Sequence, residues 1–445
     1  MELALREGRG PRAELARKVA VGVLIVAAVF LVYQMSNRPS VPFYEFWRPE
    51  LYQFWKTDVG LDWYKHYVYL ADAMRHGTFD VASVGIPDYY QDLVRDGNSK
   101  YLPYQPAPAV LLLPFVAIWG THLSEVYFSM VLGAVNVALF WYILTLLNVS
   151  RTTKILMIPF FALGTAHFYA ATTGTLWFYN HVAAVFFLLM AIVFLLRRTS
   201  PVVPALFLAF AFLSRQSTIL ATPFFLYWIV RQHYPSVLNK EALLSRQSLY
   251  PSGLFLATLL PFVGFTLWYN AVRFGGIFDT GLGTVYDSYA GIRYSFYLNQ
   301  FPDAPRFDMF DIRNILLHLY TIFLMPPDFH PDWSIFRPSP YGMSVLLTSP
   351  PFVYAALVKR DHVLKPACWM AISLVSIPVI TYFSQGWVQF GYRYMLDFMP
   401  FLLILTALGF EDHQSPGSTR IKVLLVAIAI VAGFWGRYWG TKLGW

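Results

Sequence analysis

The chain has 445 residues, of which 57% are hydrophobic and 13% are charged, with a formal net charge of +8. Soluble domains carry roughly 25% charged residues, so the composition excludes an ordinary soluble fold. The basic residues lie mostly in short links between apolar blocks, which indicates membrane topology and excludes a nucleic-acid-binding surface. We therefore expect an all-α polytopic membrane protein that forms a single domain over residues 1–445.

The first apolar run, about residues 19–33, follows a cluster of five basic residues: Arg6, Arg9, Arg12, Arg17 and Lys18. Positive charge before a span places the N-terminus in the cytoplasm, so this helix exits outward. No small-residue cleavage pattern follows the run, which predicts a retained anchor. Residues 34–123 are then the first extracytoplasmic loop.

Within this loop, residues 60–80 predict a helix that lies near the membrane surface. Tyr64, Tyr67, Leu70 and Met74 recur at three- and four-residue spacing, and Gly77 is a typical helix end. The aromatic residues are expected to lie on the bilayer. The first loop continues into residues 106–120, a short proline-interrupted apolar block that predicts an interfacial or membrane-dipping helix.

Ten further apolar blocks near the length of a span bring the predicted total to eleven. A second large extracytoplasmic loop, residues 273–339, separates the seventh span from the eighth, and five short basic links all fall on the cytoplasmic side. The later spans are expected at about 124–147, 153–172, 180–196, 202–216, 218–231, 253–272, 340–358, 366–384, 395–410 and 421–438.

Asp62 has two interpretations. A carboxylate at the start of a helix caps free backbone N–H groups, and this is the simpler reading. Near a lipid-borne substrate, the same carboxylate can deprotonate an acceptor hydroxyl while a sugar leaves a lipid phosphate. Asp58 is the rival candidate for this base.

Two arginines at predicted outer helix ends are candidates for binding a phosphate. Arg273 either snorkels to the interface or makes a bidentate phosphate contact. Arg393 either forms a local ion pair with Asp397, four residues on, or faces an outer cavity and binds a phosphate. Arg215 is a weaker candidate of the same kind.

The sequence MPPDFHPDW brings Asp328, His330 and Asp332 together. Two carboxylates and an imidazole are suitable ligands for a divalent cation. A proline-rich outer loop makes an ordinary turn the favoured interpretation, so these residues are weak metal candidates.

Four pieces of the chain, in order, resemble the GT-C superfamily of integral membrane glycosyltransferases. They are the D-x(4)-Y-x(2)-LA-x-A-x(3)-G segment from Asp62 to Gly77, the proline-rich run at 103–114, YNAVRFGGIFDTG at 269–281 and FGYRYMLDFMPFL at 390–402. The pattern is similar to the bacterial branch of protein O-mannosyltransferases and aminoarabinose transferases. Together the four pieces cover most of the chain.

The resemblance implies an inverting transferase that moves a sugar from a polyprenyl-phosphate donor to an extracytoplasmic acceptor. It gives the role of base to Asp62, with Asp58 as the alternative. Some relatives have a lysine where this chain has Gln105, so the charge for the donor phosphate falls to arginines. The residues expected to bind donor or substrate are Arg393, Arg273, Arg293, Tyr392, Tyr394, His66, Tyr67 and Gln105.

The expected reaction is a direct displacement at the cell membrane, with the active site on the extracytoplasmic face. No cofactor is required, and a divalent cation is an option that the sequence does not indicate. The expected partners are the lipid-linked sugar, the acceptor and membrane lipids, without nucleic acid. Alternative functions are a transporter or flippase of lipid-linked sugars, and a non-catalytic subunit of an envelope-assembly complex.

Overall fold

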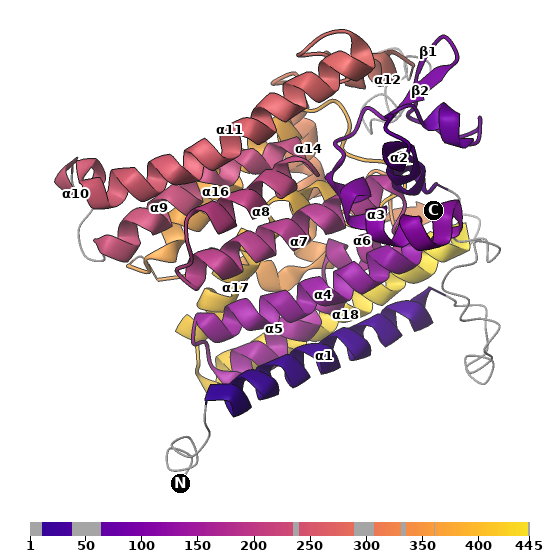
Figure 1. The fold of residues 1–445 in the computed structure, drawn as a ribbon. Coiled ribbons are helices and arrows are strands. Elements are labelled where there is room, and N and C mark those ends of the chain that lie inside the picture. The colour runs from indigo at the N-terminus through magenta and orange to yellow at the C-terminus, as the bar shows by residue number, and fades with distance from the viewer. Residues whose placement is uncertain are drawn as a thin grey trace.

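The computed structural model describes residues 11–37, 64–234, 240–288, 307–330, 335–359 and 361–443, and most of them are helical (Figure 1). The long helices lie side by side and run roughly along one direction. One end of the bundle, here called the loop end, carries α2 (His66–Arg75), α12 (Leu282–Ser288), the antiparallel pair β1 (Val94–Asp96) and β2 (Ser99–Tyr101), and the C-terminus. The described part of the predicted first outer loop, residues 64–123, therefore folds against the helix ends.

Five described helices are long and apolar enough to cross a membrane. They are α1 (Pro11–Ser36), α4 (Glu125–Leu146), α7 (Leu176–Leu196), α11 (Arg246–Phe274) and α18 (Pro416–Leu443). The pair α5 (Arg151–Leu163) and α6 (Ala166–Thr173) passes the same test together but is bent by 46°. The described residues thus contain five or six candidate spans, and the total of eleven and the cytoplasmic N-terminus stay predictions.

Other predicted spans coincide with shorter helices: α8 (Val202–Phe212), α9 (Thr222–His233), α16 (Leu364–Ile380) and α17 (Met399–Asp412). The continuous span predicted at 340–358 is wrong. This segment forms α15 (Val345–Thr348) and the 3₁₀ turn η7 (Pro350–Ala355), because two consecutive prolines lack the N–H groups that an uninterrupted helix needs. The remaining elements are η3 (Val81–Val84), α3 (Ala107–Trp119), η4 (Gly120–His122), η5 (Gln216–Ala221), α10 (Lys240–Leu244), α14 (Asn314–Phe323), β3 (Asp328–His330), β4 (Ile335–Arg337) and η8 (Arg393–Asp397).

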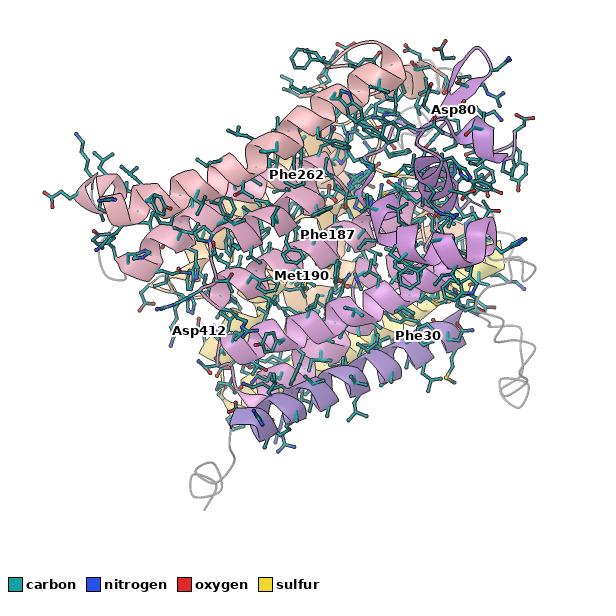
Figure 2. The ribbon with its side chains drawn as sticks, in the orientation of Figure 1. Phe30, Asp80, Phe187, Met190, Phe262 and Asp412 are labelled. Carbon is teal, nitrogen blue, oxygen red and sulfur yellow. The ribbon has the colours of Figure 1, made fainter. Side chains whose placement is uncertain are left out.

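Helix α7 forms the centre of the bundle. Of its apolar window, 78% is buried, compared with 6% for α1. Phe187 of α7 is buried in the bundle, whereas Phe30 lies on α1 at the periphery in Figure 2. A helix that is apolar on every face is stable only when other helices cover it, and α4 and α8 pack on α7.

Glycines let α18 approach its neighbours closely. A Cβ atom at Gly433 would lie 2.0 Å from the carbonyl oxygen of Leu163, and one at Gly436 would lie 2.2 Å from the ring of Phe390. Any larger residue at these positions would push α18 away from α5 and from the loop before η8. The glycines therefore set where the neighbouring Arg437 enters the loop end.

Helix α2 confirms the predicted helix near Gly77, but one detail of the prediction is wrong. The ring of Tyr67 is fully buried in the protein and does not lie on the bilayer. The carboxylate at the helix start belongs to Glu125 of α4, whose Oε2 accepts from the N–H groups of Tyr67 at 2.9 Å and Val68 at 3.3 Å. The N-cap residue of α2 is Lys65. Asp62 lies outside the described residues, so both readings of its role stay predictions.

Candidate active site

A cavity of about 650 Å³ lies at the loop end. Its walls come from the C-terminal ends of α1, α6 and α18, the N-terminal ends of α4 and α7, helix α12, the segment 64–104 and the loop that leads into η8. Most of its polar side chains belong to tyrosine, tryptophan, threonine and amide residues. Of the residues that the structure describes, the charged ones that line it are Asp92, Arg393 and Arg437.

Asp92 points its carboxylate toward two aromatic donors of the cavity wall. Its Oδ2 accepts from the Tyr104 hydroxyl at 2.6 Å and from the Trp177 Nε1–H at 2.5 Å, whereas its buried Oδ1 has no partner. Burial raises the pKa of the Asp92 carboxyl, and these two hydrogen bonds partly oppose the rise. The residue adopts a left-handed backbone conformation, with φ at 58°, that is uncommon outside glycine. This conformation holds a proton-accepting group in place.

His66 supports the turn that carries Asp92. Its Nε2 lies 2.9 Å from the carbonyl oxygen of Gln91, so Nε2 carries the proton and donates. Burial lowers the pKa of His66 to about 4, which keeps the ring neutral at neutral pH. The His66 ring also lies 4.6 Å from that of Tyr90. The predicted substrate-binding residue His66 therefore lies directly behind the cavity wall.

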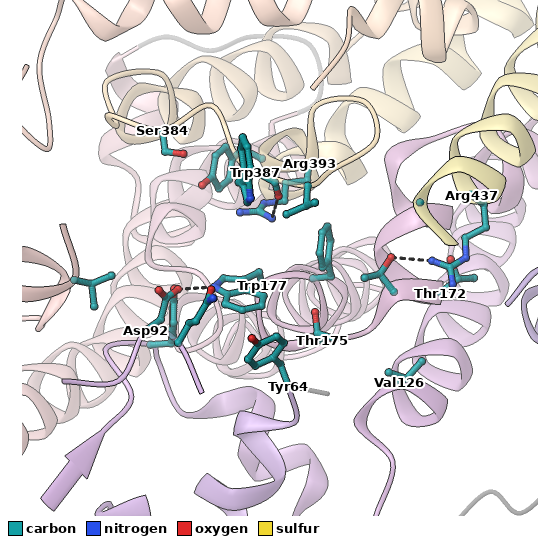
Figure 3. A pocket seen from close by; sticks show the side chains of 18 of the residues that line it. Tyr64, Asp92, Val126, Thr172, Thr175, Trp177, Ser384, Trp387, Arg393 and Arg437 are labelled. Carbon is teal, nitrogen blue, oxygen red and sulfur yellow. Dashed lines mark hydrogen bonds between the residues drawn. The ribbon is translucent and has the colours of Figure 1, made fainter. Parts of the chain in front are cut away.

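Arg393 lies on the cavity wall that faces Asp92 (Figure 3). The residue is 8% exposed, and its Nη1 donates a long hydrogen bond of 3.4 Å to the carbonyl oxygen of Trp387. Its Nε is buried without a partner, and its guanidinium lies over the rings of Phe178 at 5.1 Å and Tyr394 at 5.2 Å. A guanidinium has five N–H donors, so most of its capacity remains for a ligand.

The local ion pair considered for Arg393 and Asp397 does not form. The fully buried Asp397 instead accepts from Arg215 Nε at 3.1 Å and 3.2 Å, from Ser217 Oγ at 2.6 Å and from His181 Nδ1 at 2.7 Å. We call these four residues the Asp397 cluster. Because the cluster occupies both carboxylate oxygens, Asp397 leaves Arg393 to the cavity.

Arg437, from α18, is the second cation of the cavity. It is 5% exposed and donates to the side-chain oxygens of Thr173, at 3.2 Å, and Asn37. Its Nε is buried without a partner. Figure 3 shows Arg437 at the side of the cavity, away from Asp92 and Trp177. Both of its partners are neutral, so its charge is not balanced by them.

Arg273 is absent from the cavity lining. Its guanidinium donates to the backbone carbonyls of Leu102, Tyr104 and Tyr269, and to the side chain of Asn270. It also lies 3.5 Å from the centre of the Tyr269 ring. The structure thus uses Arg273 to hold the strand end that leads to Tyr104, on which Asp92 depends.

The other predicted site residues divide into three groups. Tyr394 lines the cavity. Tyr392 and Gln105 are buried outside the lining, as is Tyr67, and the hydroxyl of Tyr392 donates to Nδ1 of His318 at 2.6 Å. The predicted residues that lie outside the described ranges are Asp58, Asp62, Arg293 and Asp332.

The described residues contain no group of three His, Cys, Asp or Glu side chains that could hold a metal ion. Of the weak metal candidates, Asp328 pairs across the short β3–β4 ribbon with Arg337. The backbone of His330 lies in the same ribbon, and its side chain is not among those described. Burial raises the pKa of Asp328.

Asp92 and Arg437 were missed in the sequence. Asp92 lies in YYQDLVRDG, a segment without periodicity or a recognisable motif, and only its contact with the distant Trp177 distinguishes it. Arg437 did carry a signal, because an arginine within an apolar helix is costly and usually has a function. With Lys442 close behind it, Arg437 resembles an ordinary basic membrane flank.

No protein-family model matches the chain, and no curated protein matches it. Among solved structures, the chain is similar to the archaeal oligosaccharyltransferase AglB from Archaeoglobus fulgidus, solved in complex with an inhibitory peptide and a dolichol-phosphate. The similarity has a TM-score of 0.47 and 11% sequence identity, and it covers 94% of this chain. The chain spans 56% of the length of that structure. At this level, the likeness assigns no family to the chain.

Proposed function

We propose that the protein is a membrane glycosyltransferase that moves a sugar from a polyprenyl-phosphate donor to an acceptor on the extracytoplasmic face. The observation that carries this proposal is the pairing of Arg393 and Asp92 across one cavity at the end of an apolar helical bundle. A lipid-linked sugar phosphate needs an apolar region for its chain and a charged cavity for its head. The ordered sequence motifs that resemble the GT-C superfamily support the same conclusion.

In this proposal Arg393 binds the phosphate of the donor. A guanidinium presents parallel N–H groups that match two phosphate oxygens, and such charge-assisted bonds are about twice as strong as neutral ones. Arg393 meets this need because its Nε has no protein partner and Asp397 is occupied elsewhere. When the bond between sugar and phosphate breaks, negative charge grows on the leaving oxygen, and the fixed guanidinium stabilises it.

Asp92 is proposed to position the acceptor and accept its proton. The acceptor hydroxyl attacks the anomeric carbon, its proton moves to the carboxylate, and the bonding electrons of the old linkage leave with the phosphate. Tyr104 and Trp177 hold one carboxylate oxygen, which leaves Oδ1 for the acceptor. Asp62 and Asp58 stay predictions for the same role, since both lie outside the described residues.

Aromatic side chains give the cavity a surface suited to a sugar ring. Tyr64 and Trp177 meet edge to face at 5.2 Å between ring centroids, and Trp387 lies on the wall near Arg393. Small-molecule sites combine such apolar and aromatic walls with a few convergent polar groups. The sugar is therefore proposed to lie between these rings, with its phosphate toward Arg393.

The test is transfer by the purified protein in lipid nanodiscs. Incubation with a polyprenyl-phosphate sugar and candidate acceptors is expected to release polyprenyl phosphate, measured by chromatography, and Arg393→Gln and Asp92→Asn are expected to abolish most of this release. Movement of the intact donor across vesicles without any release would instead support the alternative of a flippase. Normal release by both variants would refute the assignment of the site.

A further inference from the structure

The proposed reaction needs one phosphate-binding group, yet the cavity has a second buried arginine. Arg437 uses two of its N–H groups on Thr173 and Asn37, and its Nε has no partner. Like Arg393, it is less than one-tenth exposed. Two guanidiniums with spare donors thus line the same cavity.

The charges that the described residues bring to the cavity do not balance. Arg393 and Arg437 bring two positive charges, and Asp92 brings the single negative charge among the described residues that line the cavity. Leaving a buried charge unpaired is costly, so proteins usually pair such groups with a counterion. The described residues pair neither arginine with a carboxylate, which leaves room for an anion from outside the protein.

Aromatic rings separate the two cations into different parts of the cavity. Arg393 lies over Phe178, whose ring centre lies 5.5 Å from that of Tyr169, and Tyr169 in turn lies 6.0 Å below the guanidinium of Arg437. Arg437 is therefore a separate position on the cavity wall. One phosphate bound closely by Arg393 would leave Arg437 uncompensated.

We propose that Arg437, oriented by Asn37 and Thr173, forms a second oxyanion subsite that binds a phosphate or carboxylate group while the donor phosphate lies at Arg393. The proposal rests on the proposed function of the cavity. The second anion has two sources of the same chemistry: the second phosphate of a lipid diphosphate, or an acidic group of the acceptor. In either case, the substrates together carry more negative charge than a polyprenyl monophosphate.

The test uses the full chain in nanodiscs loaded with polyprenyl monophosphate and titrated with inorganic phosphate, followed by ³¹P NMR. We expect the loaded wild type to bind phosphate, and Arg437→Gln to weaken that binding by about 10-fold or more. Arg437→Lys keeps the charge and is expected to retain part of the affinity. A wild type that binds no phosphate after loading, or an Arg437→Gln variant that binds it equally, would overturn the proposal.

A second variant tests the subsite without removing the arginine. Asn37→Asp places a carboxylate beside Arg437, so the new internal ion pair is expected to abolish phosphate binding while the protein stays folded. Unchanged phosphate binding in this variant would also count against the proposal. The Asn37→Asp variant keeps the proposal testable if Arg437→Gln does not fold.

Two further arms separate the source of the anion and the underlying function. If loading with polyprenyl diphosphate blocks the phosphate titration, the second phosphate of the lipid occupies the subsite. If phosphate still binds, the subsite belongs to an acidic group of the acceptor. Failure of the wild type to bind polyprenyl monophosphate, or equal binding by Arg393→Gln, would refute the donor site. The phosphate titration of the Arg437 variants would still test the second subsite.

Discussion

The Asp397 cluster and the cavity lie next to each other and treat arginine in opposite ways. In the cluster, Arg215 is held by both oxygens of a buried carboxylate, and His181 and Ser217 complete the hydrogen bonds. In the cavity, Arg393 and Arg437 keep unpartnered Nε groups. The ring of Tyr394 lies between the two regions. Its centre is 5.6 Å from the guanidinium of Arg215 and 5.2 Å from that of Arg393. The ion pair with Asp397 thus stabilises the cluster. The arginines of the cavity have no such pair, so their charge remains available to a ligand.

The largest expected effect is on the stability of the Asp397 cluster. Asp397→Asn leaves the mostly buried Arg215 without its counter-charge, and breaking a buried pair in this way costs about 3–5 kcal/mol. Thermal unfolding in detergent would measure the loss. Asp88→Asn, which removes an exposed carboxylate that pairs with Lys100, is the control and is expected to cost much less. Equal unfolding temperatures for the two variants would contradict the contrast.

Arg393→Gln tests the opposite behaviour in the cavity. Because Arg393 has no carboxylate partner, the variant is expected to fold normally but to lose about 100- to 1,000-fold in transfer rate. Sugar transfer and thermal unfolding would be measured on the same preparation. Arg313→Gln removes an exposed arginine outside the cavity and is expected to leave transfer unchanged. A large loss of stability in Arg393→Gln would show that the residue is structural, like Arg215.

Asp92→Asn is expected to lower transfer about 100-fold and to change its pH dependence. Burial raises the pKa of Asp92 above its ordinary value of 3.8, so the wild-type rate falls as pH drops through that raised pKa and the carboxylate becomes protonated. The variant should lack this acidic limb.

The raised pKa has a matching effect on stability. The folded protein binds the Asp92 proton more tightly than the unfolded chain, so this contribution is full below pH 3.8 and is lost as pH rises through the folded pKa. Unfolding of Asp92→Asn should not show this dependence. Asp96→Asn, at an exposed position nearby, serves as the control for both measurements.

The smallest expected effect comes from Tyr104→Phe. The Tyr104 hydroxyl donates to Asp92 and lowers the pKa of its carboxyl, so its removal should move the acidic limb of the transfer rate upward by about one pH unit. Trp177→Phe removes the second donor and should shift the limb in the same direction. A pH profile identical to that of the wild type in both variants would show that Asp92 does not set the limb.

Local features of the fold could be predicted from the sequence. The spacing of Tyr67, Leu70 and Met74 gave a helix, and α2 forms there. The long apolar blocks matched α1, α4, α7, α11 and α18 because bilayer thickness sets a length that hydropathy detects. The same average missed the break at Pro350 and Pro351, because hydropathy is insensitive to missing N–H donors.

The cavity was only partly predictable, because its members come from distant parts of the chain. Arg393 was identified from its place beside aromatic residues, but its freedom depends on Asp397 pairing with Arg215, 182 positions away. Asp92 meets Trp177 across 85 positions, and Arg437 meets Asn37 across 400. Such pairs depend on how the helices pack, which no local pattern records.

The contact between Arg437 and Asn37 also bears on how the protein is made. Helix α1 is made first and α18 last among the described helices, so the cavity lacks one wall until α18 has been made. Until then, Asn37 and Thr173 lack the guanidinium of Arg437, which donates to both of them in the folded protein. The proposed subsite can therefore bind an anion only after α18 has been made and has packed beside α1 and α6.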